Sequence, residues 1–173
     1  SNMSYSPYGV LKRVGELYTK SLGGLIVKFW NVYGIEKDMD KAHVITDFIR
    51  KGFETGVIDM MTDGTEAREF LYAEDCCEAL ETVMDEYDNL SCDDELHITT
   101  GVYTTVLEIA EEIKSLFSSI GKKITVIPDE KKDSVQRDAR NVPDPYIKEF
   151  WQPTTSVKEG LKKVFEEMRK DYE

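Results

Sequence analysis

The sequence predicts an α/β fold, because segments with helical periodicity alternate with short apolar runs that are typical of strands. At 173 residues the chain is long enough for a domain with a substantial hydrophobic core. Its composition is that of a globular protein, since 40% of the residues are hydrophobic, 32% are charged and only five are proline.

The first predicted element is a helix over residues 8–21. Pro7 suits the first turn of a helix, and the apolar residues that follow it recur at intervals of three and four positions. The Gly23–Gly24 pair ends this pattern.

A strand follows at Leu25–Trp30, where the chain is apolar except for Lys28. A nearly continuous apolar run of this length is expected for a parallel strand that is covered on both faces. Residues 31–34 then leave the carboxyl end of the strand, which is where open α/β sheets place their ligands.

The rest of the chain alternates in the same way. We expect helices at 44–52, 75–87, 105–117, 145–150 and 156–169, and strands at 57–61 and 69–73 around a turn at 63–64, at 96–99 and at 124–127. The capping-box pattern that begins helices occurs twice, at Thr105 with Glu108 and at Ser156 with Glu159. Asp75 is expected to cap the helix that it begins.

The most informative motif is the pair Tyr8 and Lys12, which lie four residues apart in the first predicted helix. Positions i and i+4 share a helix face, so the ammonium group would lie beside the phenol ring. An ammonium group stabilises a neighbouring phenolate, and such a phenol can act as a general acid or base near neutral pH. A surface lysine beside a half-buried tyrosine would produce the same spacing.

The residues around this pair resemble the extended short-chain dehydrogenase/reductase family, which contains the NAD-dependent nucleotide-sugar epimerases and dehydratases. Four segments match the family in order: Ser6–Glu16 is similar to its catalytic helix, Leu25–Gly34 to its strand ending in Asn-x-Tyr-Gly, Gly64–Asp75 to its Gly-Thr-x-x-Arg-Asp-Phe-x-Tyr-x-x-Asp block, and Leu96–Ala110 to the strand and capped helix that follow. Trp151–Ser156 and Glu159–Leu161 are similar to its closing elements. The resemblance covers nearly the whole chain.

The resemblance implies an incomplete Rossmann-like segment, made of the Tyr-x-x-x-Lys helix and the following strand, joined to the small mixed α/β substrate-binding domain. We therefore expect residues 1–34 to be a remnant of the dinucleotide-binding sheet and residues 35–173 to form the substrate-binding region. The Gly-rich turn that brings a pyrophosphate to a helix N-terminus has no match in this sequence. The chain thus resembles the carboxy-terminal part of such an enzyme and is expected to be catalytically incomplete by itself.

Two catalytic roles follow from the resemblance. Tyr8 resembles the acid/base that exchanges a proton with a sugar hydroxyl during hydride transfer. Lys12 resembles the residue that holds the nicotinamide ribose and acts on the phenol. NAD or NADP is the cofactor expected for the complete enzyme.

The resemblance also implies a site for the diphosphate of a nucleotide-diphosphate sugar. Asn31 resembles a contact to this group, although it could equally serve to turn the chain out of the strand. Arg68 resembles a phosphate-binding guanidinium, the alternative being a surface ion pair with Glu66 or Glu69. A further diphosphate contact is expected from one of two arginines: Arg137 or Arg140. They lie in a charged stretch that is either a solvated loop or the family's substrate-covering arm.

Two functions remain open. The chain is either the nucleotide-sugar-binding portion of an epimerase (an isomerase) or dehydratase (a lyase), or a non-catalytic binding or assembly module derived from that family. A homo-oligomer is expected, with the first helix as the contact, because a truncated sheet exposes apolar faces and an open strand edge.

Composition and charge exclude several other classes. The net charge of −12 argues against binding to nucleic acids and to anionic membranes. No apolar stretch approaches the length of a membrane span, so cytoplasm is the expected location. Cys76, Cys77 and Cys92 are expected to be reduced, buried thiols, and the two histidines, His43 and His97, lie in no metal-ligand pattern, so no metal site is expected.

Overall fold

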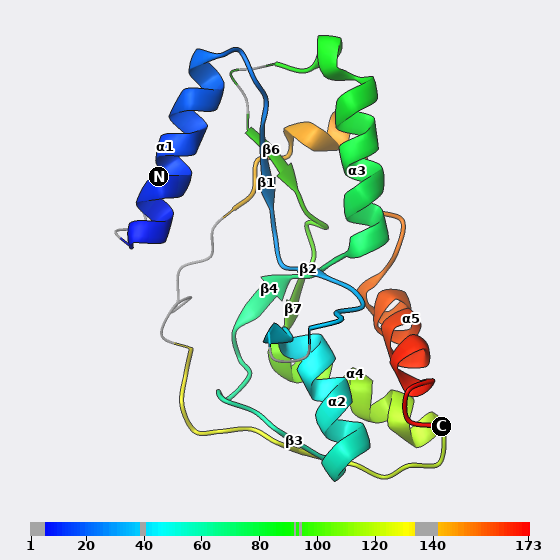
Figure 1. The fold of residues 1–173 in the computed structure, drawn as a ribbon. Helices are drawn as coiled ribbons and strands as arrows, with labels where there is room; N and C mark the ends of the chain where they lie inside the picture. Colours follow the sequence, from blue (N-terminus) through cyan, green and yellow to red (C-terminus); the bar gives the residue numbers. More distant parts are fainter. Residues whose placement is uncertain (1–5, 39–40, 92, 94, 134–141) are drawn as a thin grey trace.

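The computed structural model of the chain describes residues 6–38, 41–91, 93, 95–133 and 142–173 and has an α/β fold (Figure 1). Its helices are α1 (Pro7–Ser21), α2 (Val44–Thr55), α3 (Ala73–Asp85), α4 (Val106–Ser119) and α5 (Val157–Arg169), with the 3-10 helices η2 (Tyr87–Asn89) and η3 (Tyr146–Glu149). Its strands are β1 (Ile26–Phe29), β2 (Val32–Tyr33), β3 (Val57–Asp59), β4 (Ala67–Glu69), β5 (Leu71–Tyr72), β6 (Glu95–Ile98), β7 (Tyr103–Thr105) and β8 (Thr125–Ile127).

The strands form four pairs, of which three are parallel. β1 pairs with β6, β2 with β5 and β3 with β8 in parallel, whereas β4 pairs with β7 in antiparallel orientation. The expected parallel arrangement of the first strand is confirmed. The strands expected on the two sides of the turn at 63–64 do not pair with each other, because β3 pairs with β8 and β4 with β7.

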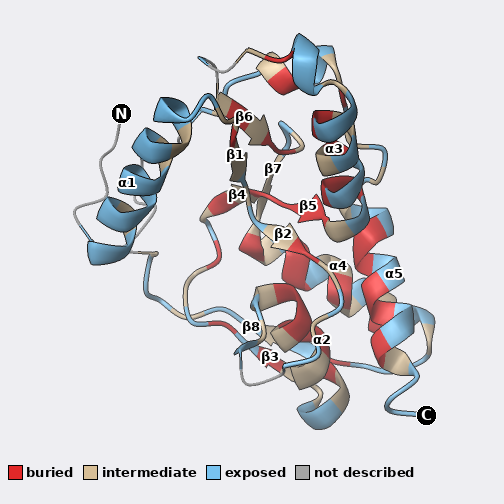
Figure 2. Ribbon diagram, turned by 45° about the horizontal axis from the view of Figure 1, so that its top comes forward, coloured by how far each residue is buried: buried red, intermediate tan, exposed pale blue. Residues whose placement is uncertain are grey.

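Buried apolar side chains form two clusters. One lies among α2, α4 and α5 and includes Phe48, Phe117 and Phe165. The other lies between α3 and the β1–β6 pair and includes Leu96 and Ile98. Figure 2 shows buried positions on the inward sides of α2 to α5, whereas α1 has none.

Several predicted element boundaries differ from the structure. α2 continues past Gly52 to Thr55 and ends at Gly56, whose φ of 71° lies in the left-handed region that glycine adopts readily. Gly52 is instead a packing position, because a Cβ atom there would lie 2.3 Å from Cε2 of Phe117. The predicted strand 69–73 divides into the end of β4 and the short β5, and Ala73 already belongs to α3.

Asp75 does not cap α3, because Tyr72 occupies the N-cap position. Its carboxylate lies in the first turn, is only 1% exposed, and accepts three hydrogen bonds. They come from Oγ1 of Thr154 at 3.1 Å and from the backbone N and Oγ1 of Thr155 at 2.9 and 3.1 Å. Asp75 therefore fastens the segment that leads into α5 onto the start of α3.

Replacing Asp75 with asparagine is expected to lower the free energy of unfolding by about 1.5–3 kcal/mol, because an amide group would face hydrogen-bond donors and the charge-assisted bonds would be lost. Urea unfolding followed by circular dichroism measures this change. Glu81→Gln, at an exposed position of the same helix, serves as the control and should change it by less than about 0.5 kcal/mol. Equal effects of the two variants would contradict the assigned role.

Candidate functional site

Helix α1 is held against the β1–β6 pair by charged side chains. Lys28, on β1, donates to Glu95 on β6 at 2.7 Å and forms an ion pair with Glu16 of α1 at 3.5 Å. Arg13 contacts Glu16 at 2.5 Å and Glu95 at 3.9 Å. The polar side of α1 thus faces the strands, and these four side chains determine how the helix lies on them.

The apolar side of α1 is exposed to solvent. Six apolar residues that share one half of the helix and its C-cap are all exposed: Val10, Leu11, Val14, Leu17, Tyr18 and Leu22. On β1, Phe29 is also 53% exposed. The sequence predicted a strand that is covered on both faces, and in the structure one face of β1 is partly open. Within the described residues β1 pairs with β6 alone, as expected for a sheet that lacks further strands.

Tyr8 and Lys12 point in the same direction, as their spacing predicts. The Nζ atom of Lys12 lies 5.5 Å from the centroid of the Tyr8 ring, and the tyrosine is 71% exposed. Ser6 begins the helix by accepting a hydrogen bond from the backbone N of Gly9 at 3.1 Å. This cap fixes the first turn, on which the phenol lies.

The first turns of α1 and the carboxyl end of β1 lie at the same end of the α1–β1 unit (Figure 1), because the chain runs along α1 and returns antiparallel along β1. Asn31 follows β1 at this end and donates through Nδ2 to the carbonyl oxygen of Glu69 at 3.4 Å. Its own carbonyl oxygen accepts from the backbone N of Leu71 at 3.2 Å. These bonds connect Asn31 to residues 69–71, and its exposed side chain lies where open α/β sheets bind ligands.

Glu69 is a buried carboxylate at the same strand ends. Its Oε2 atom accepts hydrogen bonds from Oγ1 of Thr99 and from the backbone N of Gly101, the latter at 2.7 Å. Oε1 is buried and has no hydrogen-bond partner among the residues that the structure describes. Because Thr99 directly follows β6, Glu69 joins β4 to the carboxyl end of the parallel pair.

Arg68 forms neither of the two ion pairs considered from its sequence neighbours. Its Nη2 atom contacts Oδ2 of Asp133 at 2.9 Å. Glu66 instead accepts a hydrogen bond from Thr62, and Glu69 binds the β6–β7 turn. The Arg68 side chain remains 38% exposed. Arg137 and Arg140, the other two predicted phosphate contacts, lie outside the described residues.

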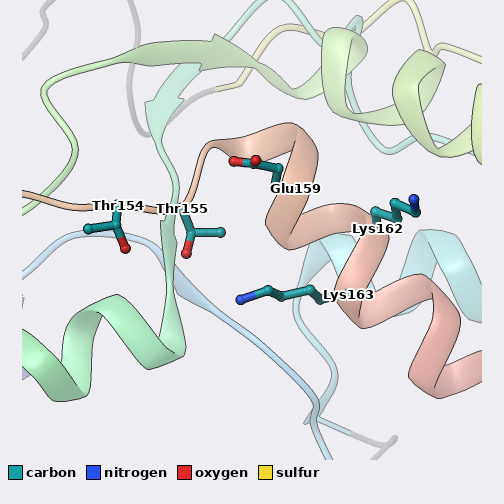
Figure 3. A pocket seen from close by; sticks show the side chains of 5 residues that line it. All are labelled: Thr154, Thr155, Glu159, Lys162 and Lys163. Atoms are coloured by element: carbon teal, nitrogen blue, oxygen red, sulfur yellow. The ribbon is translucent and has the colours of Figure 1, made fainter.

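A pocket of about 390 Å³ lies beside the start of α5 and is lined by Thr154, Thr155, Glu159, Lys162 and Lys163 (Figure 3). Figure 3 shows Lys163 extending toward the threonines and Lys162 extending away from them. Lys163 is paired with Glu74 at 3.0 Å and lies 4.8 Å from the ring centroid of Tyr72. Of the predicted site residues, the four that the structure describes, Tyr8, Lys12, Asn31 and Arg68, do not line this pocket.

Two of the three cysteines lie in the described part of the chain. Cys76 is buried, and burial raises the pKa of its thiol, whereas Cys77 is exposed, contrary to expectation. Cys92 lies outside the described residues.

No cluster of three or more His, Cys, Asp or Glu side chains suited to a metal ion occurs in the described part of the chain. None of the described helices has the length and apolar character needed to cross a membrane.

The sequence analysis missed the residues that organise this site, namely Glu16, Glu69, Glu95 and Asp133. One signal was present, because a lysine within an apolar strand must have a charged or polar partner when the strand is covered. Lys28 therefore predicted that an acidic residue lies nearby, but not which one.

The parallel strands, the Tyr-x-x-x-Lys helix and the polar side chains at the carboxyl end of β1 define a Rossmann-like α/β protein of the extended short-chain dehydrogenase/reductase type. The chain belongs to the NAD dependent epimerase/dehydratase family, whose sequence profile matches residues 3–98.

The relatives of the chain are about twice its length. It is 30% identical to a putative UDP-glucose 4-epimerase of Methanocaldococcus jannaschii over 171 residues, which cover 95% of this chain and 53% of the relative. A GDP-L-fucose synthase of Sinorhizobium fredii is 27% identical over 92% of this chain and 53% of its own length. The chain therefore spans about half the length of these curated relatives.

The chain also matches about half the length of similar solved structures. An epimerase from Methanothermobacter thermautotrophicus superposes with a TM-score of 0.83 at 20% identity, over 99% of this chain and 52% of its own. The UDP-glucose 4-epimerase of Thermotoga maritima, solved with UDP-glucose, has a TM-score of 0.79 at 25% identity, over 97% and 55% of the two chains.

The ion pairs that hold α1 predict a pH dependence. The hydrogen bond from Lys28 lowers the pKa of Glu95 below its ordinary value of 4.5. Because the folded state favours the carboxylate, its stabilising contribution is complete above pH 4.5 and is lost as the pH falls through the lowered pKa. Glu95→Gln is therefore expected to lower the free energy of unfolding by about 1 kcal/mol or less at pH 7 and by much less at pH 3.

Urea unfolding of the variant and the unaltered chain at both pH values measures this difference. Glu78→Gln, at an exposed position of α3, is the control for the removal of one charge. A destabilisation by Glu95→Gln that is equally large at pH 3 would show that the carboxylate charge does not cause the stabilisation.

Proposed function

We propose that this chain is the nucleotide-sugar-binding portion of an NAD-dependent sugar-nucleotide epimerase or dehydratase, and that it needs a dinucleotide-binding half for hydride transfer. Membership of the family and the coverage of about half of each relative support this proposal. The observation that carries it is the alignment of Tyr8 with Lys12 on α1, at the end of the α1–β1 unit where Asn31 leaves β1 (Figure 1).

In this proposal the phenol of Tyr8 exchanges a proton with a hydroxyl group of the sugar. The ammonium group of Lys12, 5.5 Å from the centroid of the Tyr8 ring, is the cation that lies next to this phenol. The 71% exposure of Tyr8 leaves the phenol accessible to a substrate. Proton transfer in either direction is then possible without movement of the backbone.

The described residues fit one end of the expected cofactor. Lys12 could hold the nicotinamide ribose, and bound NAD or NADP would supply the hydride chemistry. A pyrophosphate requires a glycine-containing turn between a strand and a helix. Among the described residues, the two direct strand-to-helix junctions, β5 to α3 and β7 to α4, contain no glycine. The pyrophosphate-binding turn must come from the other half of the enzyme.

Arg68 and Asn31 are the proposed contacts to the diphosphate of the substrate. The planar guanidinium suits bidentate recognition of phosphate oxygens, and the amide of Asn31 offers a donor on the same side of the strand ends. With a net charge of −12, the chain must provide such local donors to hold an anionic ligand.

Titration calorimetry with UDP-, GDP- and dTDP-sugars, and with NAD as a separate ligand, tests the proposal. One nucleotide sugar is expected to bind, and Arg68→Ala should weaken its binding about tenfold because a charge-assisted hydrogen bond is lost. Arg50→Ala on α2, where the arginine is paired with Asp47 and Glu54, is the matched control and should leave binding unchanged. The absence of binding by every nucleotide sugar would refute the proposal.

A second measurement addresses the catalytic roles. Adding a separately expressed dinucleotide-binding half from a relative should produce NAD-dependent turnover, and Tyr8→Phe should abolish it while leaving nucleotide-sugar affinity unchanged.

The exposed apolar side of α1 favours a second candidate function, a non-catalytic assembly module. A contiguous apolar surface on a helix, next to an open strand edge, is typical of a protein contact site. In this alternative, self-association through α1 would be the principal role of the chain, and the phenol–ammonium pair would be a remnant.

Self-association is expected in either case. Sedimentation at rising concentration should show species larger than the 19.9 kDa monomer. Leu11→Glu combined with Tyr18→Glu should shift the population to monomers, because both side chains lie on the exposed apolar side of α1. Val102→Glu, an exposed apolar position outside α1, is the control. A single monomeric species at all concentrations would contradict the assigned contact.

A further inference from the structure

The ion pair between Arg68 and Asp133 connects two segments that are distant in the sequence. Arg68 lies on β4, with Thr104 of β7 opposite it, and its Nη2 atom contacts Oδ2 of Asp133 at 2.9 Å. The Arg68 side chain is 38% exposed, whereas the aspartate side chain is only 12% exposed. Asp133 is therefore the more buried partner of this ion pair.

The segment that presents Asp133 is fixed by backbone hydrogen bonds. The backbone N of Asp129 donates to the carbonyl oxygen of Thr62 at 3.0 Å, and that of Asp63 donates to the carbonyl oxygen of Lys131 at 2.7 Å. These bonds hold residues 129–131 against the turn that precedes β4. Asp133 is consequently placed next to Arg68 by the fold and does not meet it by chance from a free loop.

A carboxylate and a phosphate group compete for the same guanidinium. Both offer paired oxygen atoms that match the N–H groups of arginine, and both are anions. Arg68 can bind a ligand phosphate in the position now held by Asp133 only after that carboxylate has moved. Displacement also returns a largely buried carboxylate to water, which relieves its need for a cationic partner.

We propose that Asp133 is a specificity-determining residue that occupies, on Arg68, the position of a ligand phosphate. The inference rests on the proposed function, because it takes Arg68 as the phosphate contact of the nucleotide-sugar site. Asp133 then excludes anions that bind a guanidinium no better than a carboxylate does, and admits a diphosphate, which offers more charge and more acceptor atoms. It also lowers the affinity of the site below what Arg68 alone would give.

Calorimetric titration with inorganic pyrophosphate at low ionic strength tests this competition directly. Asp133→Asn is expected to bind pyrophosphate about three- to tenfold more tightly than the unaltered chain, because it removes one partly exposed ion pair and the repulsion between the Asp133 carboxylate and the ligand. Combining it with Arg68→Ala should remove the gain. Glu130→Gln, an exposed position on the same segment, removes one negative charge and should change the affinity less than about twofold.

The pyrophosphate affinities of the variants distinguish competition at Arg68 from a purely structural role of Asp133. Equal pyrophosphate affinity for Asp133→Asn and the unaltered chain, or no binding by either, would overturn it. Asp133→Ser provides a second variant, and failure of both variants to fold would also overturn it, because a carboxylate that ligands displace cannot be essential for folding.

The nucleotide-sugar titrations described above distinguish this inference from the proposed function. A gain in pyrophosphate affinity in Asp133→Asn without binding of any nucleotide sugar would leave the competition at Arg68 in place and refute the proposed function. Binding of a nucleotide sugar with equal affinity by Asp133→Asn, Glu130→Gln and the unaltered chain would refute the inference about Asp133 and leave the proposed function in place.

Discussion

The position of α1 depends on charge pairing with the β1–β6 strands and not on apolar packing. Lys28 and Arg13 each contact both Glu16 and Glu95, so two cations offset two carboxylates that would otherwise repel each other. This arrangement directs the polar side of the helix inward and leaves its apolar side exposed. Tyr8 and Lys12 therefore keep a defined orientation even though α1 contributes no residue to either core. The attachment should be weaker than one made by burial of the same helix, since partly exposed ion pairs stabilise by about 1 kcal/mol or less each.

Buried carboxylates have a corresponding role in the rest of the chain. Asp75 binds the segment before α5, and Glu69 binds the turn after β6. Each accepts one backbone hydrogen bond from a segment that lies outside the strand pairs. The fold thus uses acidic side chains to fasten irregular segments, which is consistent with a chain so rich in Asp and Glu. An acidic residue is suited to this purpose because one carboxylate can accept several donors at once.

The local features of this fold were predictable from the sequence, and the contacts between distant segments were not. The capping boxes at Thr105 and Ser156 are present as predicted, because they require only residues within one helical turn. The partner of β3 was not predictable, because a three-residue strand carries no signal for the partner that lies far along the chain. Asp75 and Asp133 illustrate the same limit. Asp75 was expected to cap a helix, and Asp133 lies in the charged stretch for which a solvated loop and a substrate-covering arm were both considered. The partners of both residues are fixed only by tertiary structure.

Similarly, the site was predictable only where its residues are close in sequence. The alignment of Tyr8 with Lys12 follows from helix geometry alone and is observed. Arg68 was identified as a phosphate contact by resemblance, and that role stays a proposal. The aspartate that it contacts comes from a different segment, for which no sequence periodicity exists.

The parallel pairing of β1 with β6 has a consequence for how the chain folds. Ile26 is opposite Glu95, so β1 cannot form its hydrogen bonds until most of the intervening chain has been synthesised. During that interval an apolar segment and an amphipathic helix remain without their final contacts, and long-range parallel pairing is intrinsically slow. The helix that bears the phenol and the ammonium group should therefore reach its final position only after β6 has been synthesised, and chaperone binding would matter most before that point.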